Sequence, residues 1–555
     1  MNRVTCHSSV AAVAMLVSLR LRRFIVLLAS AFLPALTLAQ RATPEVERVP
    51  VIVNQAADAV VNYLKLDKPL GQGADRNMVL AALRKVVDQY RGTGVSHVFW
   101  NVNYQRAAYR SDVWPSYWDV ENPEQNTANW PRKYYELHKL GIDDVFTILI
   151  PRCREEHVSP WVSLRMNDHH FTRDPNWVSR LFVEHPEFLT QGGRGLFNYG
   201  KAEVRQHYLG LIDEVLDRYD VDGLELDWMR TPYNFDSQEL DRGRDILTEF
   251  MRDARRRTQA AAARRGHPVR LAARVPSTPE FARGMGFDAV AWAKGGLLDV
   301  LIPSDWTGGY PDIPVERWRE QIGADGKACL VFPGTDRAYG CAPKGPSLGL
   351  NVAAMRGFTA SMVDRGADGI YLFNHFMSVD MPLRYRTPEG KTQSDFLMGD
   401  LLRAAGDYPA AASQPRLHVL TFHDRVPNAS PYRPALPATI APRQPATLAI
   451  HTGPRPATGH YVIRAGLADS DDLAAAKLTV RLGDGVCRAL GDLPSPRKPV
   501  PRPELPRMNV CEVAPRVLQF EAPLAAGRRG QNRLELSVEE GGAQSLVWLE
   551  VAIEP

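Results

Sequence analysis

The sequence predicts an α/β fold, a (β/α)8 TIM barrel followed by a small C-terminal β-sandwich domain. Short runs rich in β-branched and aromatic residues alternate with helical patterns from about residue 49 to about residue 373. Several of these runs are continuously apolar, which is typical of parallel strands that helices cover on the outside. No glycine-rich phosphate-binding loop follows the first run, and this disfavours a doubly wound open sheet.

Eight strand-like runs define the predicted barrel: residues 49–53, 95–102, 161–166, 222–228, 269–275, 298–303, 328–332 and 369–373. The helices expected between them cover residues 77–90, 129–140, 204–218, 238–265, 287–294 and 350–365. Eight strands with intervening helices, in roughly 330 residues, match the size of a (β/α)8 barrel with enlarged loops. We therefore expect the barrel at residues 45–400.

The part of the chain after about residue 400 has a different texture, with proline-rich stretches and no helix of substance. Its strand-like runs are residues 416–422, 446–450, 461–466, 477–482, 516–521, 533–538 and 545–553. These short runs predict a β-sandwich at residues 415–555. A module that packs on the barrel is the simpler interpretation, and a glycan-binding module is the alternative.

The first 39 residues have the pattern of an export signal. A basic cluster of three arginines precedes an apolar run at 24–36, and Thr37 and Ala39 suit the −3 and −1 positions of a cleavage site. The apolar run is shorter than the roughly 20 residues that a membrane span requires. We expect an exported protein, periplasmic or extracellular, without membrane insertion after signal cleavage.

The charge balance excludes a nucleic-acid binder. The chain has 67 Lys and Arg against 63 Asp and Glu, and the predicted signal contains four arginines and no acid. The mature chain would therefore carry 63 basic and 63 acidic residues, without the basic excess that neutralises phosphates.

Cysteines are too sparse for a disulfide framework, and none shows CxxC metal spacing. In an oxidising compartment, Cys487 could pair with Cys511, and Cys329 with Cys341. Cys153 would then be the odd one, buried in a helix as a small hydrophobic residue.

The fourth strand-like run carries two acids, Glu225 and Asp227. Strand alternation places both on one side, with Leu224, Leu226 and Trp228 on the other. The leucines should face the helices, so the acids should face the barrel axis. Because burying two acids is costly unless they are paired or protonated, their presence indicates a function. The alternative is a structural network with arginines of the barrel.

Working residues of such barrels lie at the carboxyl ends of the strands, and every predicted end except the first is polar or aromatic. The candidate substrate-binding residues are Asn101, Asn103, Tyr104, Arg165, Asn167, Asp168, His169, Trp228, Arg230, Arg274, Trp306, Asn374 and His375. Carboxylates, amides and arginines suit sugar hydroxyls, and aromatic rings suit pyranose faces. Neighbouring residues at a strand end point in different directions, so we expect neither a metal nor another cofactor.

Two segments carry a family resemblance. Residues 197–205, FNYGKAEVR, and residues 218–227, RYDVDGLELD, resemble the glycosyl hydrolase-like 10 family, which has a similar stretch before the fourth strand of its barrel. Residues 222–228 also resemble the signature of glycoside hydrolase family 18, but Met229 stands where those chitinases have their acid Glu. Trp228 stands where the first family often has a second Asp. The resemblance implies a carbohydrate-active barrel with Asp227 at its centre.

These observations predict a glycoside hydrolase that acts on a poly- or oligosaccharide. In this hypothesis Asp227 is the general acid, with its pKa raised by Glu225 and partial burial, and the second carboxylate is Asp336 or Asp305. The interpretation requires the acidic pair to face a hollow that solvent can reach. One alternative is a non-catalytic glycan-binding barrel; another is a metal-dependent carbohydrate deacetylase with Asp168 and His169 as ligands.

Overall fold

The chain divides into two compact units, residues 1–46 and 47–555. The computed structural model describes residues 48–125, 129–168, 170, 172, 174, 177–191, 195–305, 311–336, 338–340, 347–374, 378–386, 392–420, 435–493 and 514–555. The predicted signal peptide therefore lies outside the described residues. None of the helices in the described ranges is both long and apolar enough to traverse a lipid bilayer.

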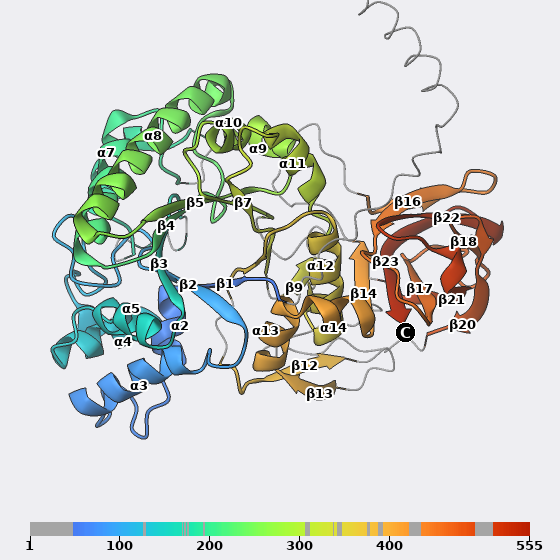
Figure 1. Ribbon diagram of the computed structural model, residues 1–555, viewed down its shortest axis with the longest axis horizontal. Coiled ribbons are helices and arrows are strands. Elements are labelled where there is room, and N and C mark those ends of the chain that lie inside the picture. Colours follow the sequence, from blue (N-terminus) through green and yellow to red (C-terminus); the bar gives the residue numbers. More distant parts are fainter. Residues whose placement is uncertain are drawn as a thin grey trace, which may run out of the picture. The chain divides into compact units, whose positions relative to one another are not determined.

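A closed parallel barrel forms the first part of the second unit (Figure 1). Its strands are β1 (Val51–Gln55), β2 (Val95–Asn101), β3 (Ser159–Arg165), β4 (Gly223–Asp227), β5 (Arg270–Pro276), β6 (Val300–Ser304), β7 (Leu330–Val331) with β8 (Gly334–Thr335), and β11 (Ile370–Leu372). The ring closes because β5 pairs with β4 and β6, and β1 pairs with β2 and β11, all in parallel. The predicted (β/α)8 barrel is confirmed, with its seventh strand split in two.

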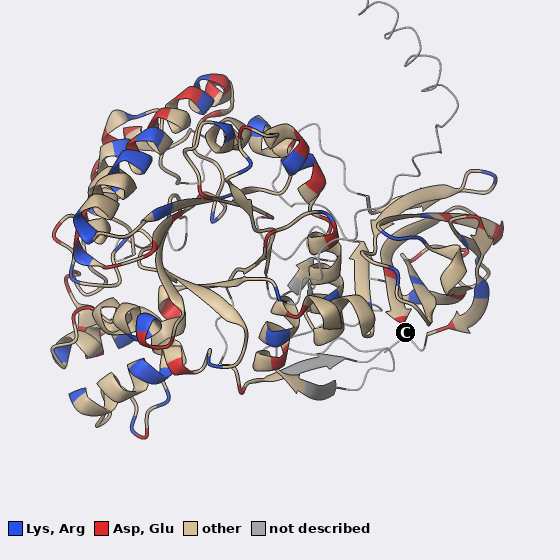
Figure 2. Cartoon of the chain, in the orientation of Figure 1, with Lys and Arg blue, Asp and Glu red and all other residues tan. Residues whose placement is uncertain are grey.

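Helices surround this barrel in Figure 1, and Figure 2 shows that most charged residues lie on them rather than on the strands. They are α2 (Ala57–Asn62), α3 (Arg76–Asp88), α4 (Asn129–Lys139), α5 (Phe146–Glu155), α6 (Arg180–Glu184), α7 (Ala202–Arg218), α8 (Leu240–Arg265), α9 (Pro279–Gly284), α10 (Ala289–Lys294), α11 (Val315–Ile322) and α12 (Val352–Asp364). The six predicted helices are present, while α2, α5, α6, α9 and α11 were not predicted. Helix α5 contains Pro151, which normally argues against a helix, and α11 has only 8 residues.

Two further helices, α13 (Met398–Gly406) and α14 (Tyr408–Ser413), follow the barrel, where the sequence indicated no substantial helix. Two small antiparallel ladders precede them, β9 (Ala338–Gly340) with β10 (Ser347–Gly349), and β12 (Pro382–Arg386) with β13 (Thr392–Leu397).

The C-terminal part consists of two antiparallel sheets, an arrangement consistent with the predicted β-sandwich. One sheet contains β14 (Arg416–Leu420), β15 (Ala438–Ile440), β17 (His460–Leu467), β20 (Arg488–Asp492), β21 (Arg516–Pro523) and β23 (Gln544–Glu554). The other contains β16 (Ala446–His451), β18 (Lys477–Leu482), β19 (Gly485–Val486) and β22 (Gln531–Glu540). All seven predicted strands are present. The strands β15, β19 and β20 were missed because they are short or, for β20, exposed along their whole length.

Helix α12 packs against β14 at Gly357. A Cβ atom at Gly357 would lie 2.1 Å from the carbonyl oxygen of Leu417, so only glycine permits this approach. On the same helix the buried Asp364 carboxylate accepts a hydrogen bond of 2.7 Å from Arg529.

Three cysteines lie among the described residues. Cys153 is buried in α5, as expected, while Cys329 and Cys487 carry free thiols rather than the suggested disulfides. Their suggested partners, Cys341 and Cys511, lie outside the described residues. Burial raises the pKa of the Cys329 thiol to about 12 and that of Cys487 to about 11.

The lower interior of the barrel is apolar and contains a large indole. Trp161 of β3 stacks on Phe99 of β2 with ring centroids 4.5 Å apart and an interplanar angle of 13°. The indole also covers the backbone of Gly223 on β4, where a Cβ atom would lie 2.4 Å from the ring. The glycine that opens the fourth strand therefore provides the space for Trp161.

This contact gives a first prediction. Gly223→Ala should lower the free energy of unfolding by about 1–3 kcal/mol, because the new methyl group overlaps the buried indole. Gly210→Ala in α7 is the matched control, because a Cβ atom there meets nothing within 4 Å and alanine favours a helix. Urea unfolding measures both variants. Equal stability of Gly223→Ala and the wild type would contradict the packing described.

Candidate active site

Three candidate residues lie at one level near the carboxyl ends of neighbouring strands. The strand register places Asp227 of β4 beside Arg165 of β3 and Arg274 of β5. All three residues are almost fully buried, with exposed fractions of 2% for Arg165, 0% for Asp227 and 1% for Arg274. Charges at this depth require partners.

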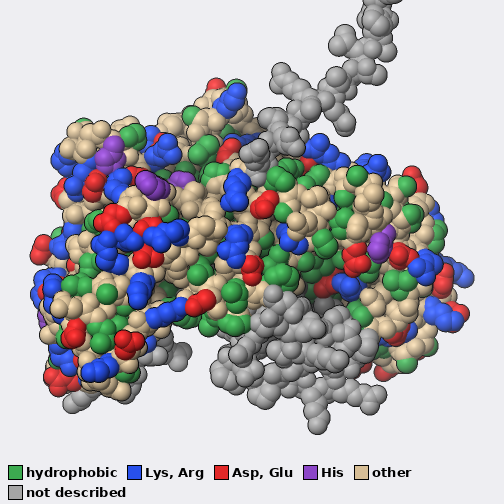
Figure 3. Space-filling model, turned by 60° about the horizontal axis from the view of Figure 1, so that its bottom comes forward, with side chains coloured by type: hydrophobic (Ala, Val, Ile, Leu, Met, Phe, Trp, Pro, Cys, Tyr) green, Lys and Arg blue, Asp and Glu red, His purple; other side chains and the backbone are tan. Residues whose placement is uncertain are grey.

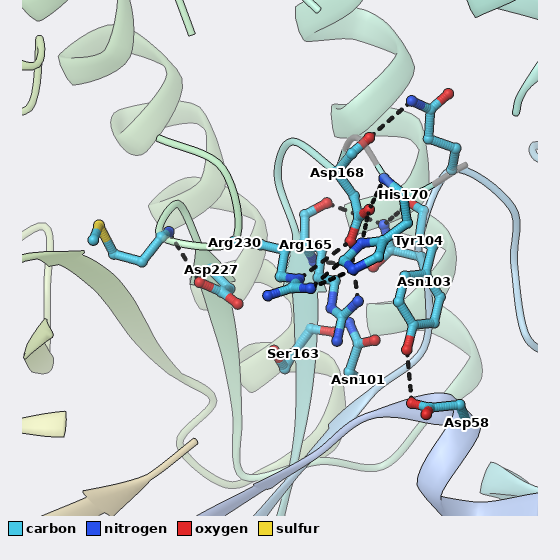
Figure 4. A network of polar contacts seen from close by, with 12 residues as sticks. Asp58, Asn101, Asn103, Tyr104, Ser163, Arg165, Asp168, His170, Asp227 and Arg230 are labelled. Carbon is cyan, nitrogen blue, oxygen red and sulfur yellow. Dashed lines mark hydrogen bonds and ion pairs between the residues drawn. The ribbon is translucent and has the colours of Figure 1, made fainter. Parts of the chain in front are cut away.

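Asp227 and Arg274 form a buried ion pair. The guanidinium Nη1 lies 3.2 Å from Oδ1 and 3.4 Å from Oδ2 of the carboxylate. Oδ1 also accepts a 3.0 Å hydrogen bond from the backbone N–H of Met229, drawn in Figure 4. Burial acts to lower the pKa of Arg274, but the charge of Asp227, together with smaller contributions from Tyr371, Glu225 and Asp305, raises the pKa above its ordinary value. The carboxylate of Asp227 and the guanidinium of Arg274 are thus paired in a site that solvent does not reach.

Arg274 is itself fixed from three sides. Its Nε and Nη2 donate to the Ser304 hydroxyl at 3.1 and 3.0 Å, and Nη2 donates to the Asp305 carbonyl at 3.1 Å. Its guanidinium carbon lies 3.6 Å from the ring centroid of Phe373, a cation–π contact. The ion pair therefore joins the ends of β4, β5, β6 and β11.

Glu225 lies one layer deeper than Asp227 and is completely buried. Its Oε2 accepts a 2.9 Å hydrogen bond from Nδ2 of Asn54, which also donates to Ser163 at 3.0 Å. Burial, followed by the charge of Asp227, raises the pKa of Glu225 to about 7. The raised pKa thus belongs to Glu225, the deeper of the two acids, and burial is its larger cause. Glu225 belongs to the barrel interior rather than to a surface that a glycan can touch.

A second charged cluster surrounds Asp168 (Figure 4). Its Oδ2 pairs with Arg165 at 3.0 Å and lies 3.6 Å from Nε of Arg230, and its Oδ1 meets Nδ1 of His170 at 2.5 Å. Burial acts to raise the pKa of Asp168, but His170, Arg165 and Arg230 together bring it well below its usual range. The other ring nitrogen of His170, Nε2, contacts Nη2 of Arg230.

The cluster reaches solvent through two of its members. The side chains of His170 and Arg230 are 33% and 17% exposed, whereas that of Asp168 is fully buried. Tyr104 supports the cluster from below, because its ring lies 3.9 Å from the Arg165 guanidinium and its hydroxyl donates to Asp58 at 2.7 Å. His170 and Arg230 are thus the partly exposed members of this cluster.

Two asparagines that were predicted to bind substrate form hydrogen bonds with the backbone instead. Asn103 donates to the carbonyls of Tyr104 and Arg165 and accepts from the Arg165 N–H. Asn167 donates to the Phe197 carbonyl at 2.9 Å and accepts from the N–H of the same residue at 3.2 Å. Both amides are fully buried and bonded to the backbone in this structure, and their contact with substrate stays a prediction. Asn101 is likewise interior, donating to the Ser163 carbonyl at 3.2 Å.

Trp228 does not offer a stacking face. Its ring is fully buried and packs against Tyr199, Phe250 and Phe287, with centroids 5.1, 5.7 and 6.0 Å away. Strand alternation, which directs Glu225 and Asp227 inward, directs Trp228 toward the helices. In this structure Trp228 therefore contributes to packing, and its role in substrate binding stays a prediction.

The remaining candidates occupy the ends of β6, β8 and β11. Asp305 is buried, Asp336 half-buried, and Asn374 has a left-handed backbone with φ of 55°, a conformation that Asn tolerates. His169, Trp306 and His375 lie outside the described residues, so their predicted roles stay predictions.

Among the described residues, the side chains around Asp168 are not arranged as metal ligands. Within the described ranges no group of three or more His, Cys, Asp or Glu side chains is arranged to hold an ion. The carboxylate of Asp168 is already bound by Arg165 and His170, and the charges of Arg165 and Arg230 oppose a cation there.

Several participants were missing from the prediction: Asn54, Ser163, Ser304, Tyr371 and Phe373. Asn54 was missed because β1 extends to Gln55, two residues beyond the predicted end at residue 53. With the polar end of β1 included, all eight predicted strands would have ended in polar or aromatic residues. Ser304 and Phe373 stand at predicted strand ends, but their sequence does not show which arginine they fix.

No family model matches the chain, and a comparison with curated protein sequences also finds no match. Among solved structures, the chain is similar to the spore cortex-lytic enzyme SleL of Bacillus megaterium, with 9% identity, a TM-score of 0.34, and coverage of 65% of this chain and 75% of that one.

Two other solved structures show likenesses of the same size. The glycoside hydrolase domain of PgaB (BpsB) from Bordetella bronchiseptica has 10% identity, a TM-score of 0.34, and coverage of 59% and 93%. A GH29 alpha-L-fucosidase from Bacteroides thetaiotaomicron has 9% identity, a TM-score of 0.33, and coverage of 88% and 92%. At these values the likenesses carry no argument about activity or substrate.

The protonation of Glu225 gives a second prediction. A raised carboxyl pKa means that the folded protein binds the proton more tightly, so this stabilisation is complete below the unfolded pKa of about 4.3. It is lost as the pH rises through the folded pKa of about 7. Glu225→Gln keeps the shape but cannot ionise, so the wild type should lose stability relative to the variant across this window. Urea unfolding at about pH 4, 6 and 8 measures the difference. Parallel profiles would disprove the assignment.

Proposed function

We propose that the protein is an exported glycoside hydrolase that cleaves a poly- or oligosaccharide at the carboxyl end of its barrel. The observation that carries the proposal is the Asp227–Arg274 pair, which holds a charged carboxylate at the end of β4. Glycoside cleavage requires one ionised and one protonated carboxyl group. The ion pair suits Asp227 to the ionised role.

In this proposal Asp227 is the nucleophile or base, rather than the acid. An adjacent guanidinium stabilises a carboxylate and opposes its protonation, and a nucleophile or base must be ionised before it reacts. The protonated partner is then Asp336 or Asp305, each of which follows a strand of the same barrel. The exposed side chains of His170 and Arg230 would meet the hydroxyl groups of the sugar.

Other properties support the proposal indirectly. The resemblance of residues 197–227 to the glycosyl hydrolase-like 10 family points to carbohydrate, and the pattern of residues 1–39 points to export. Figure 3 shows acidic and basic side chains interspersed over the face that it presents, without a continuous basic surface for nucleic acid.

A non-catalytic glycan-binding barrel is the second candidate, favoured by one specific observation. Asp227 has an exposed fraction of 0%, so a substrate can reach it only if residues above it move. This does not meet the requirement that the acidic pair face an accessible hollow. Residues 306–310 and 375–377, which follow β6 and β11, lie outside the described residues. Binding of oligosaccharides without cleavage would favour this candidate.

The deacetylase alternative is weaker. Its proposed ligand Asp168 is engaged by Arg165, His170 and Arg230, and its other ligand, His169, lies outside the described residues. Metal analysis of the purified protein distinguishes this alternative from the other two.

The third prediction tests the role of Asp227. Asp227→Asn should lower turnover of a cleavable oligosaccharide by about 10²- to 10⁴-fold, because the amide cannot act as nucleophile or base. A panel of oligosaccharides of different linkage, followed by reducing-end detection, measures turnover, and isothermal titration measures binding. The control is Asp241→Asn, whose side chain is 92% exposed on α8. Undiminished turnover by a folded Asp227→Asn variant would refute the assignment.

A further inference from the structure

A surface cleft of about 720 Å³ lies outside the residues that the proposed mechanism uses. Residues 112–115, 119–121 and 179–181 line it, together with His207. They come from the loop after β2, from the start of α6 and from α7. The volume falls within the roughly 300–1,000 Å³ that is usual for ligand-binding clefts.

The cleft belongs to the carboxyl end of the barrel. The loop after β2 and the segment between β3 and α6 both leave the carboxyl ends of their strands. His207 lies in the first half of α7, which is the half farther from the start of β4 at Gly223. Barrel enzymes bind their substrates on this face, so the cleft shares a face with the candidate active site.

Gln105 connects the cleft to the charged cluster around Asp168. Its Nε2 donates to the carbonyl of Asp168 at 2.8 Å, and its Oε1 accepts from the N–H of Ser179 at 3.5 Å. Ser179 lines the cleft, while Asp168 contacts the partly exposed His170. The length of one glutamine side chain and its hydrogen bonds thus separates the two places, and we expect one short glycan chain to span both.

The cleft is formed before any ligand binds. Trp114 stacks on His207 with ring centroids 4.2 Å apart and an interplanar angle of 11°, and its Nε1 donates to the His207 carbonyl at 3.1 Å. Glu214 of α7 fastens the loop, because its carboxylate accepts from the Ser111 hydroxyl and from the Asp112 N–H, both at 2.6 Å. A fixed cleft loses little conformational entropy when a ligand enters it.

The walls offer both an apolar surface and hydrogen-bonding groups. Val113 is 49% exposed, so its side chain can pack on the C–H groups of a sugar ring. Carboxylates accept hydrogen bonds and guanidinium groups donate them, and a sugar hydroxyl can do both. Four exposed charged residues line the cleft: Asp112, Asp119, Glu121 and Arg180.

The charges around the cleft balance among the described residues. Besides Arg180, Arg218 lies 3.5 Å from Asp112, and the buried Arg106 donates to the Asp119 carbonyl at 3.0 Å. Three guanidinium groups therefore accompany the three carboxylates. Burial lowers the pKa of His207 to about 4, so its ring adds no charge at neutral pH. A cleft without excess charge favours an uncharged ligand over an acidic one.

We propose that this cleft is a subsite for an uncharged glycan chain, which it holds beside the candidate active site. The proposal rests on the proposed action of the barrel on carbohydrate. One part of the chain packs on Val113 and binds Arg180, while another part meets His170 and Arg230. The substrate is therefore a chain of several neutral sugars, because a single sugar cannot reach both places.

The fourth prediction tests the subsite with neutral oligosaccharides of increasing length, starting from a disaccharide. Arg180→Ala and Val113→Asp should each weaken binding of the longer chains by about tenfold, the effect of one lost charge-assisted hydrogen bond or apolar contact. Both should leave binding of the disaccharide unchanged. Val486→Asp is the matched control, because Val486 is 59% exposed on β19 and far along the chain from the cleft.

Isothermal titration in the Asp227→Asn background measures binding without cleavage. Should that background fail to fold, the dependence of KM on chain length in the otherwise wild-type protein gives the same comparison. Equal affinity of the cleft variants and the control for the longest chain would overturn the subsite alone. Tighter binding of an oligogalacturonate than of the neutral chains would also overturn it. Absence of binding to every oligosaccharide would overturn the proposed function as well.

Discussion

The buried ion pair between Asp227 and Arg274 holds the upper half of the barrel together. The exposed fractions of its two side chains are 0% and 1%. Each side chain compensates the charge of the other, which would otherwise be too costly to bury. Removing either partner of such a pair typically costs about 3–5 kcal/mol, because the other charge remains buried and unpaired. Through Ser304 and Phe373, Arg274 extends this constraint to β6 and β11.

The three buried acids of the barrel, Asp227, Asp168 and Glu225, differ in their partners. Asp227 is paired with Arg274, and Asp168 is paired with Arg165, so each charged carboxylate has its own guanidinium. Glu225 accepts a hydrogen bond from the neutral amide of Asn54 and lies deeper, so burial and the nearby Asp227 raise its pKa to about 7. One barrel therefore pairs two acids with guanidinium groups near its mouth and holds a third acid, whose pKa is raised, in its centre. This separation is what acid–base chemistry requires of two neighbouring carboxyl groups.

The sequence predicts the barrel well because continuous apolar runs and long helices give strong local signals. It also identifies Asp227 and Arg274 as site residues. Their pairing could not be predicted, since it depends on the register between β4 and β5. The alternation of side chains along a strand already directs Trp228 toward the helices. A stacking role for its ring therefore conflicted with that pattern. The contacts of Asn167, in contrast, could not be predicted, because the backbone groups that it binds come from loops distant in sequence.

A double-mutant cycle on the free energy of unfolding tests the central ion pair most directly. The variants are Asp227→Asn, Arg274→Met and their combination, followed by urea denaturation at neutral pH. Each single variant should lose about 3–5 kcal/mol, and the double variant should lose clearly less than the sum of the two. Strictly additive losses would show that the two charges do not stabilise each other, and would contradict this account of the site.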